Sequence, residues 1–302
     1  MYDIIIVGGG PAGLTAAIYG LRAGKSVLVI EKNAFGGQIA SSPKVENIPG
    51  IKAISGTDFA DQLANQVMDL GADVEFENVT SVEKYDDIFS VNTEEGNCYT
   101  GQTVILAIGV KHRTLDLHKE EELIGKGISF CAVCDGAFYT GKNVAMIGGG
   151  NSAMQEALLL SEVCNKVTIV QNLSNFTGEK KLIDAILQKK NIETIFNTVV
   201  TNYETEDQEL VGLHLRNEIT SEEFRIKVDG AFLAIGLMPE NKQFESLAKL
   251  NNYGYFDADE TCITETDGLF VAGDCRNKTI RQVVTAASDG AIAAMNACKY
   301  LD

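Results

Sequence analysis

The sequence predicts an α/β protein with two Rossmann-like dinucleotide-binding domains, each a three-layer ββα fold, the second inserted in the first. A strand, a glycine turn and a helix follow one another near the N-terminus, and the same order recurs near the middle of the chain. Strand-like segments follow each of these units. The 302 residues exceed the usual size of one domain, so we expect two hydrophobic cores.

The first unit starts with an apolar strand at 3–7, a helix over about 12–23 and a second strand at 26–30. Its turn has the spacing Gly8-x-Gly10-x-x-Gly13, which permits a tight turn, close approach of the backbone to a pyrophosphate and close helix packing. Glu31 ends the second strand, where an acid binds a ribose hydroxyl. These features together predict a dinucleotide site.

The second unit repeats this order with a strand at 143–147, a helix over about 152–163 and a strand at 166–171. Its turn reads Gly148-x-Gly150-x-x-Ala153, and alanine is an accepted third residue. The second strand ends in Gln171-Asn172-Leu173, which offers neither the carboxylate that suits NAD nor the arginine that suits NADP. We expect a nucleotide pocket that lacks its charged groups.

Each half is also expected to carry a β-meander, from strand-like segments at 72–76, 79–84, 88–93 and 103–107, and at 199–203, 210–216, 224–227 and 230–235. Polar residues at 118–122 and 239–241 are candidate crossing points between the domains. The predicted domains are residues 1–113 with 244–302, and the inserted residues 114–243.

Cys131 and Cys134 have the C-x-x-C spacing at which two thiols can close a redox-active disulfide, and Asp135 beside them can handle a proton. Two buried apolar cysteines are the alternative. We expect buried apolar side chains at the five scattered cysteines, residues 98, 164, 262, 275 and 298.

The formal charge of −17 argues against nucleic-acid binding, which requires a basic surface. No apolar run has the length of a membrane helix, and the apolar N-terminus lacks the basic start of a secretory signal, so we expect a soluble cytoplasmic protein. The three histidines, residues 112, 118 and 214, lack metal-ligand spacing, and no metal site is expected. Partners should be small molecules or proteins.

Nearly the whole chain resembles the low-molecular-weight, thioredoxin-reductase-like flavoproteins. The motifs that carry the resemblance are Gly8-Gly-Gly-Pro-Ala-Gly13, Gly36-Gly-Gln38, Glu46-Asn47-Ile-Pro-Gly50, Cys131-Ala-Val-Cys-Asp-Gly136, Gly148-Gly-Gly-Asn-Ser-Ala153, Ala272-Gly-Asp274 and Arg281-Gln-Val-Val-Thr-Ala286. The resemblance implies a homodimer that binds FAD and reduces thioredoxin.

The resemblance also implies which residues bind FAD. The first glycine turn and Glu31 would hold the pyrophosphate and ribose, Asp274 the ribityl chain, and Arg281 with Gln282 the pyrimidine edge of the flavin. The full implied set is Gly8, Gly10, Pro11, Ala12, Gly13, Glu31, Lys32, Gly37, Gln38, Asn47, Gly109, Gly273, Asp274, Arg281, Gln282 and Val283.

For the dithiol, the resemblance implies that Cys134 faces the flavin and that Cys131 attacks the disulfide of thioredoxin. Cys134 would then resolve the mixed disulfide. Because a carboxylate near thiols raises their pKa, the value of Asp135 must lie in proton transfer rather than in making thiolate.

The chain departs from the members of this family that use NADPH. They carry His-Arg-Arg and a further arginine where this chain has Gln171-Asn172-Leu173 and Thr177, so the clamp for the 2′-phosphate is missing. Ile108 stands where relatives usually have threonine. This pattern resembles the ferredoxin-dependent flavin thioredoxin reductases, and it implies reduced ferredoxin as the electron donor.

Three other functions stay open. NADH or weakly bound NADPH could still donate through the surviving turn at Gly148. The protein could act as a dithiol oxidase that passes electrons to oxygen, or as a non-catalytic flavoprotein that senses redox state. Five lysines against two acids over residues 166–190 could steer an acidic protein, or could be an ordinary solvated surface.

Overall fold

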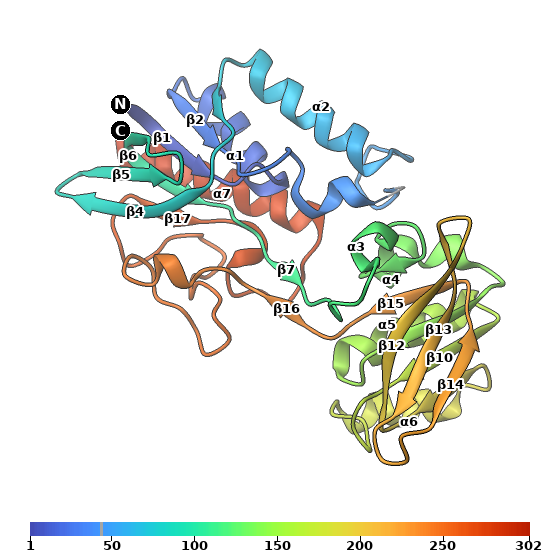
Figure 1. Cartoon of the computed structure of the whole chain (residues 1–302). Helices are drawn as coiled ribbons and strands as arrows, with labels where there is room; N and C mark the ends of the chain where they lie inside the picture. The colour runs from blue at the N-terminus through green and yellow to red at the C-terminus, as the bar shows by residue number, and fades with distance from the viewer. Residues whose placement is uncertain (43–44) are drawn as a thin grey trace. The chain divides into compact units, whose positions relative to one another are not determined.

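The computed structural model describes residues 1–42 and 45–302, and it divides the chain into two compact units. Unit 1 comprises Met1–Lys111 and Met238–Asp302, and unit 2 comprises His112–Leu237. Figure 1 shows the chain from blue at the N-terminus to red at the C-terminus, with unit 2 in green to orange. The α/β fold with two Rossmann-like halves is confirmed.

Unit 1 is built on a central sheet with the strand order β3-β2-β1-β6-β5-β4. A seventh strand, β17, also pairs with β6, at its C-terminal end. Pairing is parallel from β3 to β6 and between β6 and β17, and antiparallel along β6-β5-β4. These strands are β1 (Tyr2–Val7), β2 (Val27–Ile30), β3 (Asp73–Glu75), β4 (Val79–Tyr85), β5 (Ile88–Thr93), β6 (Cys98–Leu106) and β17 (Leu269–Val271).

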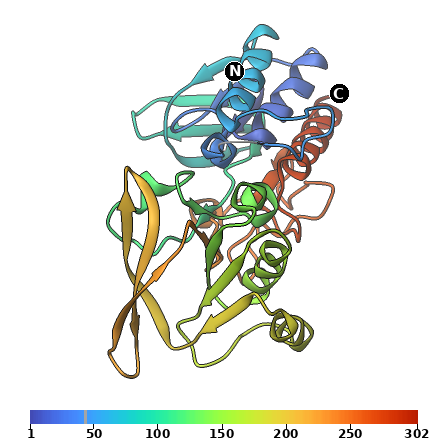
Figure 2. The ribbon, with the colours of Figure 1, turned by 90° about the vertical axis from the view of Figure 1, so that its right-hand side faces the viewer.

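Alternating side chains of the parallel strands enter two different cores, which gives unit 1 its three layers. Ile4 and Ile6 of β1 pack with helices α1 and α7, whereas Ile5 packs with β4 and β5. Figure 2 shows α7, in red, as a long helix of this unit. The helices are α1 (Pro11–Arg22), α2 (Gly56–Asp69) and α7 (Val283–Leu301).

Unit 2 has a five-stranded parallel sheet in the order β11-β10-β9-β15-β8. Val144 and Met146 of β9 face α5 and α6, while Ala145 faces the antiparallel strands. The elements are β8 (Ile128–Ser129), β9 (Asn143–Ile147), β10 (Lys166–Val170), β11 (Ile192–Ile195), β15 (Gly230–Leu233), α3 (Glu120–Leu123), α4 (Ala132–Asp135), α5 (Asn151–Val163) and α6 (Lys180–Gln188).

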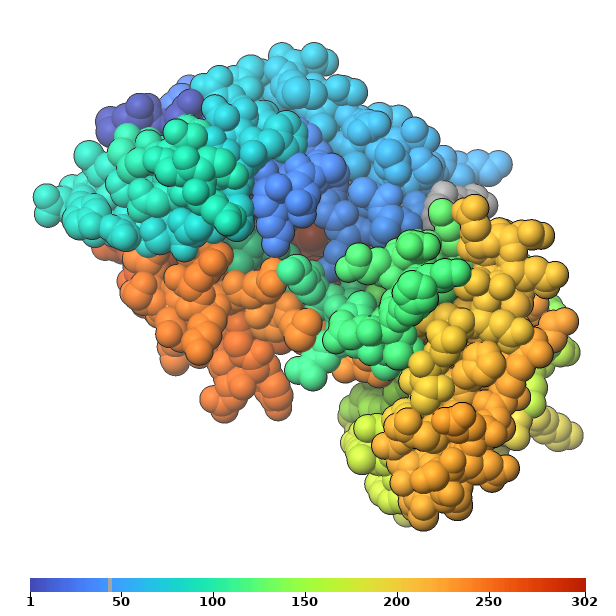
Figure 3. Space-filling view, viewed as in Figure 1, coloured from blue at the N-terminus to red at the C-terminus, as the bar shows by residue number. Residues whose placement is uncertain are grey.

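The antiparallel layer of unit 2 has three strands rather than the four segments expected from the sequence. They are β12 (Thr198–Glu206), β13 (Glu209–Asn217) and β14 (Glu223–Lys227), and Figure 3 shows them in yellow to orange on an outer face of the unit. The fourth segment, β15, is buried along its length and pairs in parallel with β9. In unit 1, β3 likewise joins the parallel sheet instead of the meander.

The chain crosses between the units at β7 (Lys111–His112) and β16 (Leu237–Met238), which pair with each other in a two-stranded sheet. The predicted boundaries, 113/114 and 243/244, lie further along the chain because the polar segments used to place them are not linkers. Glu120 is buried and accepts a hydrogen bond from the Tyr203 hydroxyl at 2.9 Å, within unit 2. Asn241 is buried and donates to the carbonyls of Gly254 and Cys275, within unit 1.

The scattered cysteines agree with the sequence prediction only in part. Cys164, Cys262 and Cys275 are buried, Cys298 is half-buried and Cys98 is exposed. Cys98 begins β6 at its open end, where the side chain meets Ser90 at the surface. Within the described residues, no helix is both long and apolar enough to span a membrane.

Candidate functional site

The first glycine turn joins β1 to α1 in unit 1. Gly8 has a φ of +108°, and a Cβ there would collide with the carbonyl oxygen of Ala107. A Cβ on Gly13 would collide with the carbonyl oxygen of Gly8. At Gly10 the nearest atom to a Cβ position is 3.9 Å away, so the outer side of the turn is open. Glycine is therefore required at two positions, and the third leaves room for a ligand.

The N-terminus of α1 opens onto this turn. Pro11 is its first residue, Ala12 and Gly13 are buried behind it, and Gly10 caps the helix without a side chain. Glu31 accepts a hydrogen bond from the Gly9 amide at 2.6 Å through Oε2. The uncapped amides attract an anion, and the fixed carboxylate can accept a hydroxyl, so the turn fits a dinucleotide.

Asp274 lies just beyond β17, after Gly273, whose φ is +82°. Burial raises the pKa of the Asp274 carboxyl, while Lys278 and Arg281 act in the opposite direction. Its Oδ1 is buried and has no hydrogen-bond partner among the described residues. A buried oxygen of this kind requires a donor, and a ligand hydroxyl supplies one.

Other predicted residues of unit 1 lie close to Asp274. Arg281 donates from Nε to the carbonyl of Asp274 at 3.3 Å, and Asn47 donates to Oε1 of Gln282 at 3.1 Å. Val283 begins α7 directly after Gln282. The sequence-predicted residues at 47, 274 and 281–283 are thus brought together by three separate segments.

The remaining predicted residues differ in their surroundings. Gln38 donates to the carbonyl of Val110, next to Gly109, which has a φ of +65°, and Gly37 has a φ of +57°. These contacts place the 37–38 turn beside the end of β6. Lys32 instead forms a half-exposed ion pair with Glu240 at 3.3 Å.

A buried ion cluster that the sequence analysis missed supports the Asp274 loop. Arg276, 1% exposed, makes two 2.8 Å hydrogen bonds to the carboxylate of Asp289 on α7. Lys278 donates to Asp289 at 2.8 Å, and the Gly273 amide donates to it at 3.0 Å. Burial opposes ionisation of Asp289, but the hydrogen bonds from Arg276 and Lys278 outweigh it and lower the pKa. No sequence motif predicts this cluster.

In unit 2, Cys131 and Cys134 form a disulfide with Cα atoms 5.3 Å apart. Cys131 is the N-cap of α4, and its sulfur accepts the Cys134 amide at 3.2 Å. Both cysteines are partly exposed, and Val133 between them is 60% exposed. The pair is therefore accessible to a protein partner, and an amide hydrogen bond is in place to stabilise a thiolate on Cys131.

Asp135 follows Cys134 directly, ends α4 and is buried. Its Oδ2 accepts the Ser129 hydroxyl at 2.6 Å, and the Ser129 oxygen accepts the Cys131 amide at 3.1 Å. Burial raises the pKa of Asp135, whereas the Ser129 hydrogen bond lowers it. Asp135 can hold a proton near the sulfurs, and Ser129 is a supporting residue that no sequence pattern identified.

The second glycine turn has the backbone conformation of a dinucleotide-binding turn, but no arginine lies at the positions that would bind a 2′-phosphate. Gly148 has a φ of +124°, and the Gln171 side chain lies against Gly149, where a Cβ would be 2.5 Å from its amide carbon. Gln171 is buried and donates to the carbonyl of Asn175 at 3.2 Å. Asn172 and Leu173 are exposed. Two arginines of unit 2 pair with acids elsewhere: Arg225 with Glu204 of β12, and Arg216 with Glu218 just after β13.

The positive charge over residues 166–190 is smaller in the folded unit than in the sequence. Lys166 forms an ion pair with Glu193 at 2.5 Å, and Lys189 pairs with Glu162. Both acids lie outside the segment and reduce its local net charge from +3 to +1. This arrangement favours an ordinary solvated surface over a steering patch.

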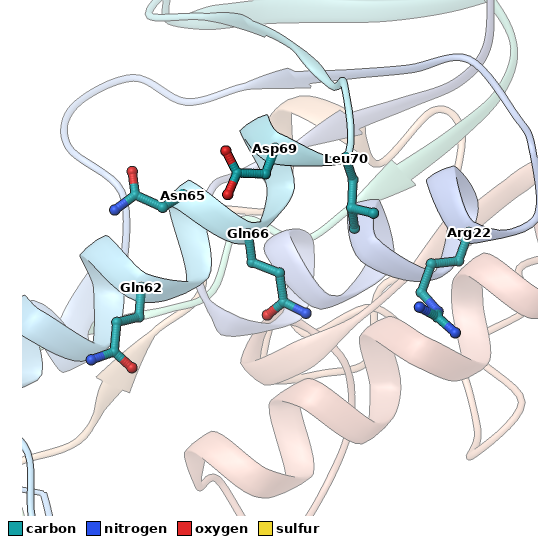
Figure 4. Close-up of a pocket in the computed structure, with 6 residues that line it drawn as sticks. All are labelled: Arg22, Gln62, Asn65, Gln66, Asp69 and Leu70. Atoms are coloured by element: carbon teal, nitrogen blue, oxygen red, sulfur yellow. The ribbon is translucent and has the colours of Figure 1, made fainter.

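A pocket of about 390 Å³ lies between α1 and α2 in unit 1 (Figure 4). It is lined by Arg22, Gln62, Asn65, Gln66, Asp69 and Leu70. None of these residues belongs to the glycine turn, the Asp274 loop or the dithiol, so the pocket is separate from the candidate site.

Comparison with known proteins identifies the class of this chain. Residues 2–290 match the model of the pyridine nucleotide-disulphide oxidoreductase family. The thioredoxin reductase of Bacillus subtilis is 36% identical over 304 residues, covering 100% of this chain and 95% of the relative. A 34.2 kDa protein of the Clostridium pasteurianum rubredoxin operon is 39% identical, over 99% of this chain and 97% of the relative.

The crystal structure of a thioredoxin reductase from Streptococcus pyogenes gives a TM-score of 0.94 at 34% identity, covering 100% of this chain and 98% of that one. The chain belongs to the pyridine nucleotide-disulphide oxidoreductase family. Within that family it is a low-molecular-weight, thioredoxin-reductase-like flavoprotein, and its cofactor is FAD.

Proposed function

We propose that the chain reduces the disulfide of thioredoxin through Cys131 and Cys134, with reduced ferredoxin as the electron donor. The observation that carries the proposal is an intact dithiol in the same unit as a glycine turn that lacks every arginine of a phosphate clamp. We further propose, as the sequence predicts, that the enzyme is a cytoplasmic homodimer.

FAD would be held by the implied residues of unit 1, and when bound it supplies a group that can take up single electrons and release them in pairs. The glycine turn and Glu31 suit its phosphates and ribose, because the turn has open space, uncapped amides and a fixed carboxylate. The unpartnered Oδ1 of Asp274 suits a hydroxyl of its ribityl chain.

In the reduced protein, Cys131 attacks the thioredoxin disulfide, and Cys134 then displaces the bound thioredoxin sulfur to restore the internal disulfide. The Cys134 amide, 3.2 Å from the Cys131 sulfur, stabilises the attacking thiolate. Asp135 donates a proton to the leaving sulfur and is kept in reach by Ser129.

Asp135→Asn is expected to lower turnover with thioredoxin about 10²- to 10⁴-fold, because asparagine keeps the Ser129 contact but carries no exchangeable acid proton. Burial raises the Asp135 pKa, so the wild-type rate should fall as the pH rises through this elevated pKa. The variant should not show this fall in rate. Steady-state rates from pH 5 to 9 measure both effects. Asp229→Asn, at an exposed carboxylate of the same unit, should behave as wild type. An unchanged pH profile in Asp135→Asn would exclude the assigned role.

A nicotinamide donor is the second candidate, because the turn at Gly148 keeps its φ of +124° and α5 has no side-chain cap at its N-terminus. Without a guanidinium, NADH and NADPH would bind weakly and with little discrimination.

Anaerobic titration of the flavin absorbance with NADPH, NADH and reduced ferredoxin separates the two donors. We expect ferredoxin alone to bleach the flavin rapidly and oxidised thioredoxin to restore the colour. Asn172→Arg with Leu173→Arg, at two exposed positions, should gain bleaching by NADPH if the missing clamp is the cause. Rapid bleaching of the wild type by NADPH would contradict the proposed donor.

A further inference from the structure

Besides Asp135, a second carboxyl group is hydrogen bonded to α4, the helix that carries the dithiol. Glu156 lies in the middle of α5, and its Oε2 accepts the Ala132 amide at 3.2 Å. Ala132 is the first residue of α4, directly after Cys131. Glu156 is thus hydrogen bonded to the backbone directly after Cys131.

In the disulfide state the pKa of Glu156 lies close to neutral pH, so above pH 7.5 the carboxyl is mostly ionised and can still take up a proton. Burial raises the pKa of Glu156 to about 7, and the Ala132 hydrogen bond opposes this shift. In the part of the chain that the structure describes, no lysine, arginine or histidine forms an ion pair with it. Among the elements packed against α5, α4 and the turn after it carry Cys131, Cys134, Asp135 and Tyr139, α6 carries Lys180, Lys181 and Asp184, and β10 carries Lys166. Lys166 pairs with Glu193, and the causes of the Glu156 pKa shift are burial and the Ala132 hydrogen bond.

Reduction of the disulfide changes the charge that Glu156 faces. The Cys131 sulfur already accepts the Cys134 amide, which stabilises a thiolate there. An ionised carboxylate next to that thiolate is a like-charge pair, and such pairs raise the pKa of the acid. The carboxyl of Glu156 should therefore bind a proton more tightly once the disulfide is reduced.

We propose that Glu156 carries one of the two protons that accompany reduction of the disulfide, so that Cys131 is a thiolate beside a neutral carboxylic acid. This inference rests on the proposed redox role of the dithiol. The S–S bond takes up two electrons, which FAD would supply when bound, and two protons, of which Cys134 takes one and Glu156 takes the other. When thioredoxin is reduced, Asp135 delivers the proton to the leaving sulfur and is then reprotonated, so that Cys134 and Glu156 together give up the two protons that the two thioredoxin sulfurs gain.

The test counts protons in the holoenzyme without ferredoxin or thioredoxin. The dithiol is equilibrated anaerobically with reduced and oxidised dithiothreitol between pH 7.5 and 8.5, and the trapped thiols of Cys131 and Cys134 are measured by mass spectrometry. Reduction of the wild type takes up two protons, as many as dithiothreitol releases, so its equilibrium constant should not change with pH. In Glu156→Gln it takes up one, and the constant should rise about tenfold per pH unit.

Matched variants separate proton uptake from a structural effect. Glu162→Gln removes the same charge from the same helix, where Glu162 pairs with Lys189, and should keep the flat wild-type profile. Glu156→Asp, which keeps a carboxyl group, should also stay flat. A merely structural role would shift the constant equally at every pH. Parallel profiles for the wild type and Glu156→Gln would overturn the inference, and would leave the proposed donor and substrate untouched.

Discussion

Cys134→Ser is expected to abolish turnover with thioredoxin, to roughly a thousandth of the wild-type rate or less, while FAD stays bound. Cys131 can still attack thioredoxin in this variant, but no second sulfur is present to release it. The variant should therefore accumulate a covalent one-to-one adduct with thioredoxin, visible on a non-reducing gel. Cofactor content is read from the flavin absorbance of the purified protein.

Two further variants make this result specific. Cys131→Ser should lose turnover without forming the adduct, because the partly exposed attacking sulfur is gone. Cys98→Ser, at an exposed cysteine of unit 1, should match the wild type. Full turnover of Cys134→Ser would remove the dithiol from the mechanism, and a non-catalytic flavoprotein would then be the better account.

Asp289→Ala is expected to destabilise unit 1 by about 3–5 kcal/mol, because it leaves the buried Arg276 guanidinium and the Lys278 ammonium without their shared partner. Urea unfolding, followed by flavin fluorescence and by circular dichroism, measures the loss. The folded-state pKa of Asp289 lies below its ordinary value of 3.8. The stabilisation is therefore present above that value and is lost as the pH falls through the lower folded-state pKa.

An exposed ion pair provides the contrast for this prediction. Asp302→Ala removes the 2.6 Å pair with Lys25, in which Asp302 is 73% exposed, and should leave the free energy of unfolding almost unchanged, because solvent and salt screen an exposed pair. Equal losses in the two variants would show that burial of the Arg276 cluster is not what makes it important for stability.

The sequence predicted the elements of the fold wherever hydrophobic period and glycine turns coincide. The strands 143–147 and 166–171 and the helix at 152–163 match β9, β10 and α5 to within one residue at each end. Assignment of strands to layers was less accurate, because a short apolar segment such as β15 has the same composition in a parallel sheet and in a meander. The domain boundaries placed from the polar composition of residues 118–122 and 239–241 differ from those of the structure. Buried hydrogen bonds hold Glu120 and Asn241 within their own units, and polar composition alone does not reveal such bonds.

For the site, local spacing was sufficient for the dithiol and both glycine turns but not for residues that act from a distance. Asp289 follows Arg276 by 13 positions, and Glu156 follows Ala132 by 24. Neither pair has a motif, since each contact is produced by the packing of one helix against another segment. Asp274, Arg281 and Asn47 were found through the family resemblance alone, because Gly-Asp and surface arginine are common in sequences of any function.

The split construction of unit 1 determines the order in which the protein can assemble during synthesis. Helix α1 contacts α7 so closely that a Cβ on Gly290 would collide with the carbonyl oxygen of Ala12. A ribosome releases α1 first, then the whole of unit 2, and α7 last. The dithiol unit can therefore complete its core on the nascent chain while the glycine turn of unit 1 still lacks its helical support. FAD can therefore bind its complete site only after α7, the last helix, has been synthesised and has packed against α1.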